Sequence, residues 1–287
     1  MSDIKICYVD FWPGFDVNCN WFNLVFKDCF SKHNFTFSST PENADIIIGS
    51  CFGNNIRKID NNCKKIVYIG ENERPIEYFK YYDYALSFDF DNYEGKNFRL
   101  PHWMLYINWW GEPNFPHARI SVDQLTYQWS PEEVWNRKNF CAIIVGNPVQ
   151  TRLRVAYILN EYKQVHGYGK VYGKHFEGDK LKLLENYRWN ICFENSITNG
   201  YITEKFLEAK IAGCIPIYYG STSVKHDFNE KCGLNFINFN DNPDELVDKI
   251  KYYEMKPYFI SLASEPLFNT IPSLDDLYTF LQENIKL

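Results

Sequence analysis

Short apolar runs that alternate with helix-like stretches constrain the fold of this chain more than any other feature of its sequence. The first half holds five such runs, at residues 4–9, 35–37, 45–48, 65–69 and 84–87. The second half holds four, at residues 140–145, 164–166, 189–193 and 215–219. Helical patterns lie between and after them, at residues 21–30, 153–162, 202–212, 244–253 and 273–285. Strands and helices that alternate form parallel sheets covered by helices, so the sequence predicts an α/β fold.

An irregular segment at residues 88–137 separates the two halves. It holds four prolines and an aromatic cluster around Trp103, Trp109 and Trp110, a composition typical of loops and linkers. We therefore expect an N-terminal Rossmann-like domain at residues 1–137, a second Rossmann-like domain at residues 138–265 and a helical segment at residues 266–287.

Charge and apolar content exclude several classes of protein. The 287 residues include 30 Lys and Arg against 36 Asp and Glu, and a net charge of −6 disfavours a broad electrostatic grip on nucleic acid or anionic lipid. No apolar run reaches the roughly 18 residues of a membrane span. The nine cysteines show no C-x-x-C spacing, so neither a zinc cluster nor a disulfide framework is indicated. We expect a cytoplasmic protein, leave peripheral membrane attachment open, and find no indication of an oligomeric state.

The densest polar motif follows one of the apolar strands. It reads Phe193-Glu194-Asn195-Ser196 and then Gly200-Tyr201-Ile202-Thr203-Glu204-Lys205, with a helix that begins near Ile202. Unpaired N–H groups at a helix N-terminus favour an anion, and Lys205 adds a full positive charge there. The pattern suits a diphosphate, with Glu204 accepting hydrogen bonds from sugar hydroxyls. The alternative is that Thr203 and Glu204 only cap the helix and that Lys205 is solvated.

This segment closely resembles the donor-binding signature of the α-1,3-fucosyltransferases, glycosyltransferase family 10. The resemblance continues through Phe206, Ala209, Ala212-Gly213 and Ile215-Pro216-Ile217-Tyr218-Tyr219-Gly220. Upstream, Tyr68-Ile69-Gly70-Glu71-Asn72-Glu73-Arg74-Pro75 looks like the N-terminal catalytic segment of bacterial, Helicobacter-type members. Phe140-Cys141-Ala142 and Asn147-Pro148, followed by Arg152, resemble the start of the family's donor domain.

The resemblance implies a GT-B fold, in which two Rossmann-like domains face each other across a cleft. It also implies inverting transfer of L-fucose from GDP-β-L-fucose to the 3-OH of GlcNAc in an N-acetyllactosamine-type glycan. GDP-fucose and an oligosaccharide acceptor would then be the partners, with no nucleic acid and no required metal or other cofactor. Two alternatives stay open: a GT-B transferase that uses another nucleotide sugar, and a non-catalytic glycan-binding module.

The resemblance also implies roles for single residues. Glu71 matches the catalytic base, and partial burial after an apolar strand would raise its pKa toward neutrality. Glu73 is the rival base, although we expect it to face away and pair with Arg74. The signature assigns Asn195, Tyr201, Glu204 and Lys205 to the donor site. It also makes Glu204 a second catalytic carboxylate.

Three further assignments depend on weaker signals. Arg152 matches the pyrophosphate arginine, with Arg154 as the alternative. On the acceptor side, the candidates are Trp12, Glu73 and Trp109. Two further motifs resemble functional sites of other enzymes: a D-x-D sequence at Asp89-Phe90-Asp91 and an elbow-like Gly49-Ser50-Cys51-Phe52-Gly53. The D-x-D form binds divalent metal in other glycosyltransferases, but it lies in the half opposite the diphosphate signature, so we predict no metal site. A hydrolase elbow needs a helix directly after it, and Asn54-Asn55-Ile56 is a poor helix start.

Overall fold

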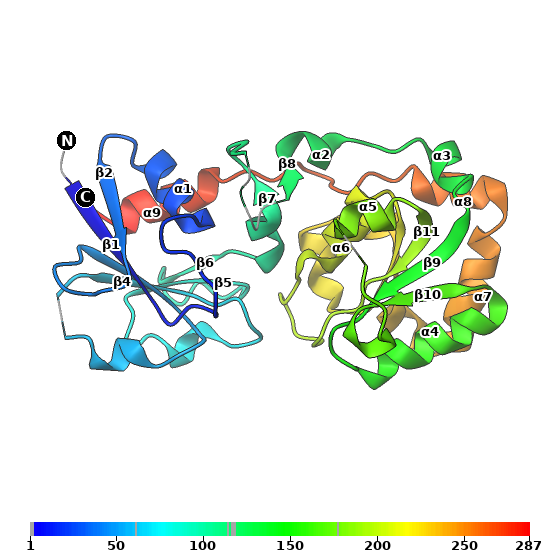
Figure 1. Cartoon of the computed structure of the whole chain (residues 1–287), viewed down its shortest axis with the longest axis horizontal. Coiled ribbons are helices and arrows are strands. Elements are labelled where there is room, and N and C mark those ends of the chain that lie inside the picture. Colours follow the sequence, from blue (N-terminus) through cyan, green and yellow to red (C-terminus); the bar gives the residue numbers. More distant parts are fainter. Residues whose placement is uncertain (1–2, 61, 114, 116–118, 177) are drawn as a thin grey trace. The chain divides into compact units, whose positions relative to one another are not determined.

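The computed structural model describes residues 3–60, 62–113, 115, 119–176 and 178–287. The chain divides into two compact units (Figure 1). The first unit comprises Met1–Ser121 together with Pro272–Leu287, and the second comprises Val122–Ile271. Among the described residues, no helix is both long enough and apolar enough to cross a membrane.

A six-stranded parallel sheet forms the core of the first unit. Its strands, in the spatial order β2-β1-β3-β4-β5-β6, are β2 (Asn34–Ser38), β1 (Asp3–Val9), β3 (Ile46–Ser50), β4 (Lys64–Tyr68), β5 (Tyr84–Ser87) and β6 (Asn97–Arg99). Every residue of β3 is buried, because the sheet is covered on both faces and both sides of the strand need apolar contacts. The order reverses between β1 and β3, and at such a switch point ligands bind beyond the carboxyl ends of the strands.

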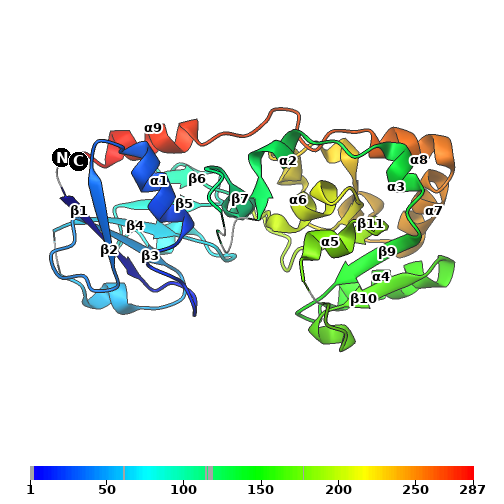
Figure 2. The ribbon, with the colours of Figure 1, turned by 45° about the horizontal axis from the view of Figure 1, so that its top comes forward.

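Two helices cover one face of this sheet. Helix α1 (Trp21–Cys29) lies beside the C-terminal helix α9 (Asp275–Asn284), as Figure 2 shows. The amide of Gln282 donates to the carbonyl of Cys29 at 3.0 Å, and the hydroxyl of Tyr278 donates to Asp28 at 2.6 Å. The 3₁₀ turns η1 (Asn55–Lys58), η2 (Pro75–Glu77) and η3 (His102–Tyr106) complete the unit, with a two-stranded pair of β7 (Ile107–Asn108) and β8 (Ile120–Ser121).

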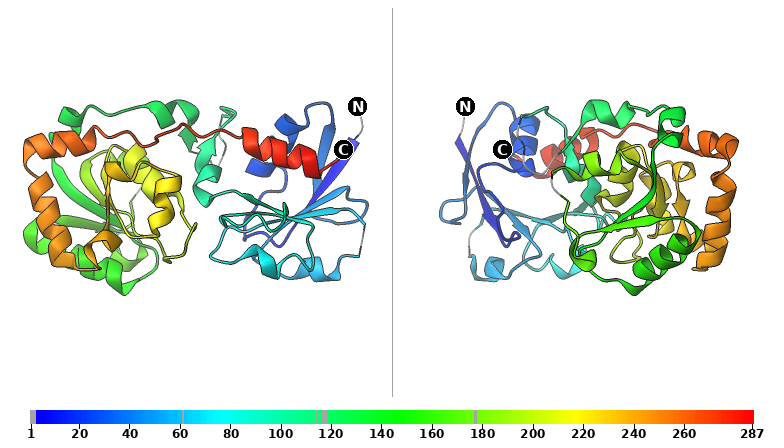
Figure 3. Two further views of the ribbon diagram at one scale, coloured as in Figure 1. Left: turned by 180° about the vertical axis from the view of Figure 1, so that it is seen from behind. Right: turned by 45° about the vertical axis from the view of Figure 1, so that its right-hand side comes forward.

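A five-stranded parallel sheet forms the core of the second unit. Its spatial order is β10 (Val165–Tyr168), β9 (Asn139–Ile144), β11 (Tyr187–Ile191), β12 (Ile215–Tyr218) and β13 (Leu234–Asn235). Its helices are α2 (Val122–Thr126), α3 (Pro131–Trp135), α4 (Gln150–Tyr162), α5 (Lys180–Leu184), α6 (Glu204–Ile211), α7 (Pro243–Tyr253) and α8 (Lys256–Ala263). Figure 3 shows α7 and α8, in orange, along one side of this unit. Trp189 and Ile143 in the sheet and Phe259 of α8 are fully buried in the shared core.

The observed units differ from the predicted domains at both boundaries. The first unit ends at Ser121 and not at residue 137, because α3 packs on α8 and the ring of Trp135 lies 5.2 Å from that of Phe259. The end of the chain is not a separate segment, because the apolar face of α9 packs against α1 of the first unit.

Candidate functional site

The carboxylate of Glu194 organises the polar signature of the second unit. Glu194 follows β11 and is only 3% exposed. Its Oε1 accepts a hydrogen bond from the backbone N–H of Thr203 at 2.8 Å, and its Oε2 accepts one from the Thr203 hydroxyl at 2.7 Å. A negative charge at this end of a helix satisfies an N–H group that has no partner within the helix, and it interacts favourably with the helix dipole. Glu194 therefore fixes the start of α6.

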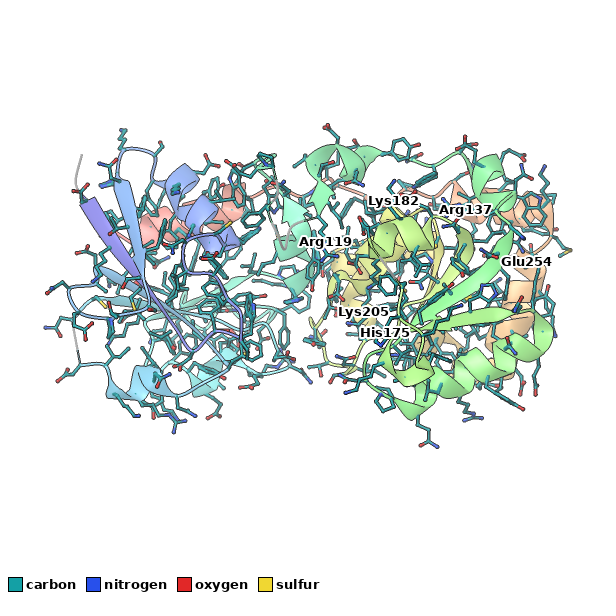
Figure 4. All side chains as sticks on the ribbon, in the orientation of Figure 1. Arg119, Arg137, His175, Lys182, Lys205 and Glu254 are labelled. Carbon is teal, nitrogen blue, oxygen red and sulfur yellow. The ribbon has the colours of Figure 1, made fainter. Side chains whose placement is uncertain are left out.

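Lys205 in the first turn of α6 completes this cluster (Figure 4). Its Nζ donates to Glu194 at 3.1 Å and to the hydroxyl oxygen of Thr203 at 2.7 Å, and it lies 3.7 Å from Glu204. Burial lowers the pKa of Lys205, but the carboxylates of Glu194 and Glu204 outweigh burial and raise this pKa above its ordinary value. Lys205 is thus a permanently charged and mostly buried ammonium, and the alternative that it is merely solvated is wrong.

Thr203 occupies the N-cap position of α6 without capping the helix through its side chain. Its hydroxyl donates to Glu194 instead of accepting from a backbone N–H. The expected capping role therefore belongs to Glu194, which comes from a different part of the motif. Tyr201 beside it is buried, whereas Asn195 is exposed.

Arg152 of α4 contacts the same segment. Its Nη2 donates to the carbonyls of Phe193 at 2.6 Å and Glu194 at 3.2 Å, and to the side-chain oxygen of Asn195 at 3.1 Å. Burial lowers the pKa of Arg152, and the charge of Glu194 opposes that effect. Arg154 is exposed, so Arg152 is the arginine that contacts the signature.

A second ion pair, which the sequence did not indicate, lies behind this cluster. Lys180 at the start of α5 pairs with Glu208 of α6, and both side chains are largely buried. A small cavity of about 30 Å³ is lined by three cationic side chains, those of Arg152, Lys180 and Lys205. Three cationic side chains therefore meet beside the start of α6, where the carboxylates of Glu194 and Glu208 pair with Lys205 and Lys180. Glu194 belongs to the motif, but the sequence analysis assigned it no role, and no sequence signal pointed to Lys180.

The carboxylates predicted on the acceptor side lie in the turn that follows β4 of the first unit. The backbone N–H of Glu73 donates to the carbonyl of Glu71 at 2.8 Å, which forms a tight turn. Glu71 is exposed and not partly buried as expected, because this turn carries it beyond the end of the strand. Glu73 accepts a hydrogen bond from the hydroxyl of Tyr78.

Arg74 does not pair with Glu73, so that expectation is wrong. Its guanidinium instead lies 2.8 Å from Asp89 and packs over the ring of Phe88 at 4.9 Å. Asp89 also accepts a hydrogen bond from the hydroxyl of Tyr93 at 2.7 Å. The D-x-D sequence therefore begins with a residue engaged in structural contacts, and within the described ranges no group of three or more potential metal-ligating side chains was found.

The predicted acceptor-side tryptophans lie in different surroundings. Trp12 packs edge-on against Phe52 with the ring centroids 5.9 Å apart, and against Phe15 at 5.2 Å. Trp109 donates its indole N–H to the carbonyl of Met104 at 3.0 Å, so its side chain is held by a residue only five positions earlier in the chain.

Asp10, which follows β1, was missed by the sequence analysis. Its carboxylate accepts hydrogen bonds from the backbone N–H groups of Asn55 at 2.9 Å and Ile56 at 3.0 Å. It thereby anchors the loop that carries the elbow-like sequence after β3. Burial raises the pKa of Cys51 in that loop, which disfavours a nucleophilic thiolate and a hydrolase role.

Comparison with solved structures defines the class of fold. The crystal structure of an α1,3-fucosyltransferase with GDP-fucose matches at a TM-score of 0.76 and 25% identity, and covers 100% of this chain and 91% of that one. An α-glucosyltransferase in complex with UDP and DNA matches at a TM-score of 0.52 and 11% identity over 98% of this chain and 95% of that one, a likeness of fold alone. With its two parallel α/β units and its cationic site at a helix N-terminus, the chain is a glycosyltransferase of the GT-B type, which confirms the predicted fold class.

Two family models then identify the family. The Alpha-(1,3)-fucosyltransferase FucT N-terminal domain matches residues 6–106, and the Glycosyltransferase family 10 (fucosyltransferase) C-term matches residues 134–258. The chain belongs to glycosyltransferase family 10, the fucosyltransferases, as the resemblance implied. A curated relative, the Alpha-(1,3)-fucosyltransferase FucT of Helicobacter pylori, is 29% identical over 93% of this chain. The match covers 61% of that relative's length.

Proposed function

We propose that this chain transfers L-fucose from GDP-β-L-fucose to the 3-OH of GlcNAc in an N-acetyllactosamine-type glycan, with inversion at the anomeric carbon. The observation that carries the proposal is the cluster of Lys205, Arg152 and Glu194 at the start of α6. Support also comes from the likeness to the α1,3-fucosyltransferase structure with GDP-fucose.

Lys205 and Arg152 would hold the diphosphate of the donor. An ammonium has three N–H donors, and two of those of Lys205 are directed at Glu194 and Thr203. The third can donate to a phosphate oxygen. Because Glu194 fixes the position of Lys205 before the donor arrives, little side-chain entropy is lost on binding. Asn195, Tyr201 and Glu204 would contact the rest of the donor, with Glu204 accepting from a hydroxyl.

Glu71 would act as the general base. In the proposed step it takes the proton of the acceptor hydroxyl while that oxygen forms a bond to the anomeric carbon of fucose and the bond to GDP breaks on the opposite face. Lys205 and Arg152 neutralise the charge that develops on the departing diphosphate, so the proposal needs no metal ion. Glu73, held by Tyr78, would contact the acceptor without taking the proton.

The test is transfer from a panel of nucleotide sugars to an array of GlcNAc-containing acceptors, with the product linkage determined by NMR. We expect GDP-fucose to be the donor used and an α1,3 linkage to form. Transfer from another nucleotide sugar would replace the proposed donor. Saccharide binding without release of GDP would identify a glycan-binding module that has lost turnover.

A further inference from the structure

The loop at residues 192–203, which we call the donor loop, joins β11 to α6 and carries Asn195 and Tyr201 of the proposed donor site. Its middle is exposed, and the side chain of Ile197 keeps 45% of its surface in contact with solvent. Its two ends are buried. Because exposed loops open locally at little cost in free energy, the contacts at the two ends decide how well the donor residues are positioned.

The end of β12 holds the first end of the donor loop. The backbone N–H of Glu194 donates to the carbonyl of Tyr219 at 2.9 Å. The hydroxyl of Tyr218, which is fully buried, donates to Oε1 of Glu194 at 3.4 Å. A Cβ at Gly220 would lie 2.2 Å from that hydroxyl oxygen, so glycine leaves the room that this contact needs. Backbone and side-chain contacts together therefore fix the start of the loop.

Two buried serines hold the other end of the donor loop. The hydroxyl oxygen of Ser223 accepts a hydrogen bond from the backbone N–H of Gly200 at 2.9 Å, and the same hydroxyl donates to Ser221 at 2.8 Å. Ser221 caps the 3₁₀ turn η5 (Thr222–His226) by accepting from the N–H of Ser223 at 3.1 Å. Because the single proton of the Ser223 hydroxyl is directed at Ser221, the lone pairs of its oxygen are left for Gly200.

The backbone of Gly200 depends on this contact. Its φ is +85°, a left-handed conformation that glycine enters freely and also leaves freely, so other groups have to fix it. The Ser223 hydroxyl also satisfies a buried backbone N–H, which would cost free energy if it were unpaired. Tyr201 follows directly, and its own N–H donates to the carbonyl of Thr198 at 3.0 Å. The contact of Ser223 with Gly200 therefore sets the direction in which the chain enters Tyr201 and the first turn of α6.

We propose that Ser223 is a positioning residue for the donor, because it holds Gly200 in the conformation that places Tyr201 and the first turn of α6 against GDP-fucose. The inference rests on the proposed function. Ser223 acts through Gly200, from which it is 23 positions away in the chain, and the proposal requires no contact between Ser223 and the donor.

The test compares Ser223→Ala with the wild type in the whole chain, by calorimetry of GDP binding and by steady-state kinetics with GDP-fucose and N-acetyllactosamine. The variant leaves the N–H of Gly200 unpaired. We expect GDP affinity to fall, and the KM for GDP-fucose to rise, by about threefold to tenfold, the effect of one lost hydrogen bond. The acceptor KM should stay unchanged. Ser223→Thr keeps the hydroxyl and should recover most of the donor affinity.

Ser87→Ala is the matched control. Ser87 is fully buried and its hydroxyl donates to Asn97 at 2.8 Å, so this variant also removes one buried hydrogen bond, but from the first unit. It should lower the urea midpoint of unfolding and leave GDP affinity unchanged. Ser221→Ala is a second variant of the same contact, because it removes the group that orients the Ser223 hydroxyl. It should weaken GDP binding less than Ser223→Ala does.

The outcomes separate this inference from the proposed function. GDP affinity that falls in Ser223→Ala and not in Ser87→Ala supports the inference even if the wild type transfers no fucose. Equal GDP affinity in the wild type and Ser223→Ala overturns the inference and leaves the function standing. Equal losses of GDP affinity in Ser223→Ala and Ser87→Ala also overturn it, because lost stability then accounts for both. If Ser223→Ala does not fold, Ser221→Ala decides in the same way, and GDP affinity equal to that of the wild type overturns the inference.

Discussion

The ammonium of Lys205 lies 3.1 Å from the carboxylate of Glu194, and this contact joins the end of β11 to the first turn of α6. The carboxylate is fully buried, whereas the Lys205 side chain keeps 20% of its surface exposed. One end of the pair is therefore structural and the other faces solvent. A residue that binds a charged ligand has to be held in position and still be accessible to the ligand. Glu194 holds Lys205 in position, and the exposed part of the Lys205 side chain leaves it accessible.

Replacement of Glu194 by Gln should lower both stability and GDP affinity. The variant keeps the shape of the side chain but leaves Lys205 without its main counter-charge. Loss of one partner of a buried pair costs about 3–5 kcal/mol, and we expect the lower end because Lys205 is partly exposed. Urea unfolding measures the stability and calorimetry measures GDP affinity. Glu204→Gln is the control, because Glu204 lies farther from Lys205, at 3.7 Å, and its loss should destabilise much less.

Replacement of Lys205 by Ala should act mainly on the donor. Charge-assisted hydrogen bonds contribute roughly 1.5–3 kcal/mol, so GDP affinity should fall by about tenfold to a hundredfold. The matched control is Lys182→Ala, which removes an ammonium with 75% of its side chain exposed from the same unit. Unchanged GDP affinity in Lys205→Ala, measured by calorimetry, would remove Lys205 from the diphosphate site.

Several strands could be predicted from the sequence because their apolar residues form continuous runs. The predicted strand at residues 84–87 coincides with β5 (Tyr84–Ser87), and the one at residues 65–69 is displaced by one residue from β4 (Lys64–Tyr68). Strands of two or three residues, such as β6 and β13, are too short to show the run or alternation of apolar residues from which a strand is predicted. Helix α8 (Lys256–Ala263) was not predicted; it holds Pro257 in its first turn, where proline is well accommodated.

The candidate site was predictable only where its residues lie in one stretch of sequence. Lys205 could be found because it follows a strand, a turn and a helix start in order. Lys180 could not, because its contact with Glu208 joins residues that are 28 positions apart. The hydrogen bonds of Asp10 to the loop at Asn55 span 45 positions, and only the folded sheet brings these residues together.

Replacement of Glu71 by Gln should lower fucose transfer by about a hundredfold or more, the usual contribution of a general base. GDP affinity should stay unchanged, since Glu71 and Lys205 belong to different units. Glu73→Gln is the matched control and should alter the acceptor KM more than kcat. The reverse pattern, a lost kcat only in the Glu73 variant, would assign the base to Glu73. Steady-state kinetics with GDP-fucose and N-acetyllactosamine distinguish the two.

Replacement of Gly49 by Ala should destabilise the first unit by about 1–3 kcal/mol, the usual cost of overpacking. The added Cβ would meet the hydroxyl oxygen of Tyr82 at 1.9 Å, whereas the nearest ring carbon lies at 2.7 Å. Tyr82→Phe in the same chain should therefore restore part of the loss. Urea unfolding of the two single variants and the double variant measures this coupling. Strictly additive losses would show that the hydroxyl is not the group that Gly49 accommodates.

Glu254 should make stability depend on pH in the acid range. Its carboxylate lies 2.7 Å from both Lys163 and Arg188 and accepts a hydrogen bond from Trp189 at 2.9 Å. Burial alone would raise the pKa of Glu254, but these partners outweigh burial and lower it below the ordinary value of 4.5. A lowered folded-state pKa gives stability that is present above that ordinary value and is lost as the pH falls through the folded-state pKa.

Glu254→Gln should therefore be less stable than the wild type by about 3–5 kcal/mol at pH 7, because it leaves the charge of Arg188 largely buried and without its partner. The difference between the two proteins should shrink as the pH falls below 4.5, because the unfolded wild type then takes up a proton first, and the folded carboxylate follows at its lower pKa. Urea unfolding at pH 7, 5, 4 and 3 measures it. Glu185→Gln, which breaks an exposed pair with Lys182, should show no such trend. A difference that stays constant from pH 7 to 3 would mean that the ionisation of Glu254 adds nothing to stability.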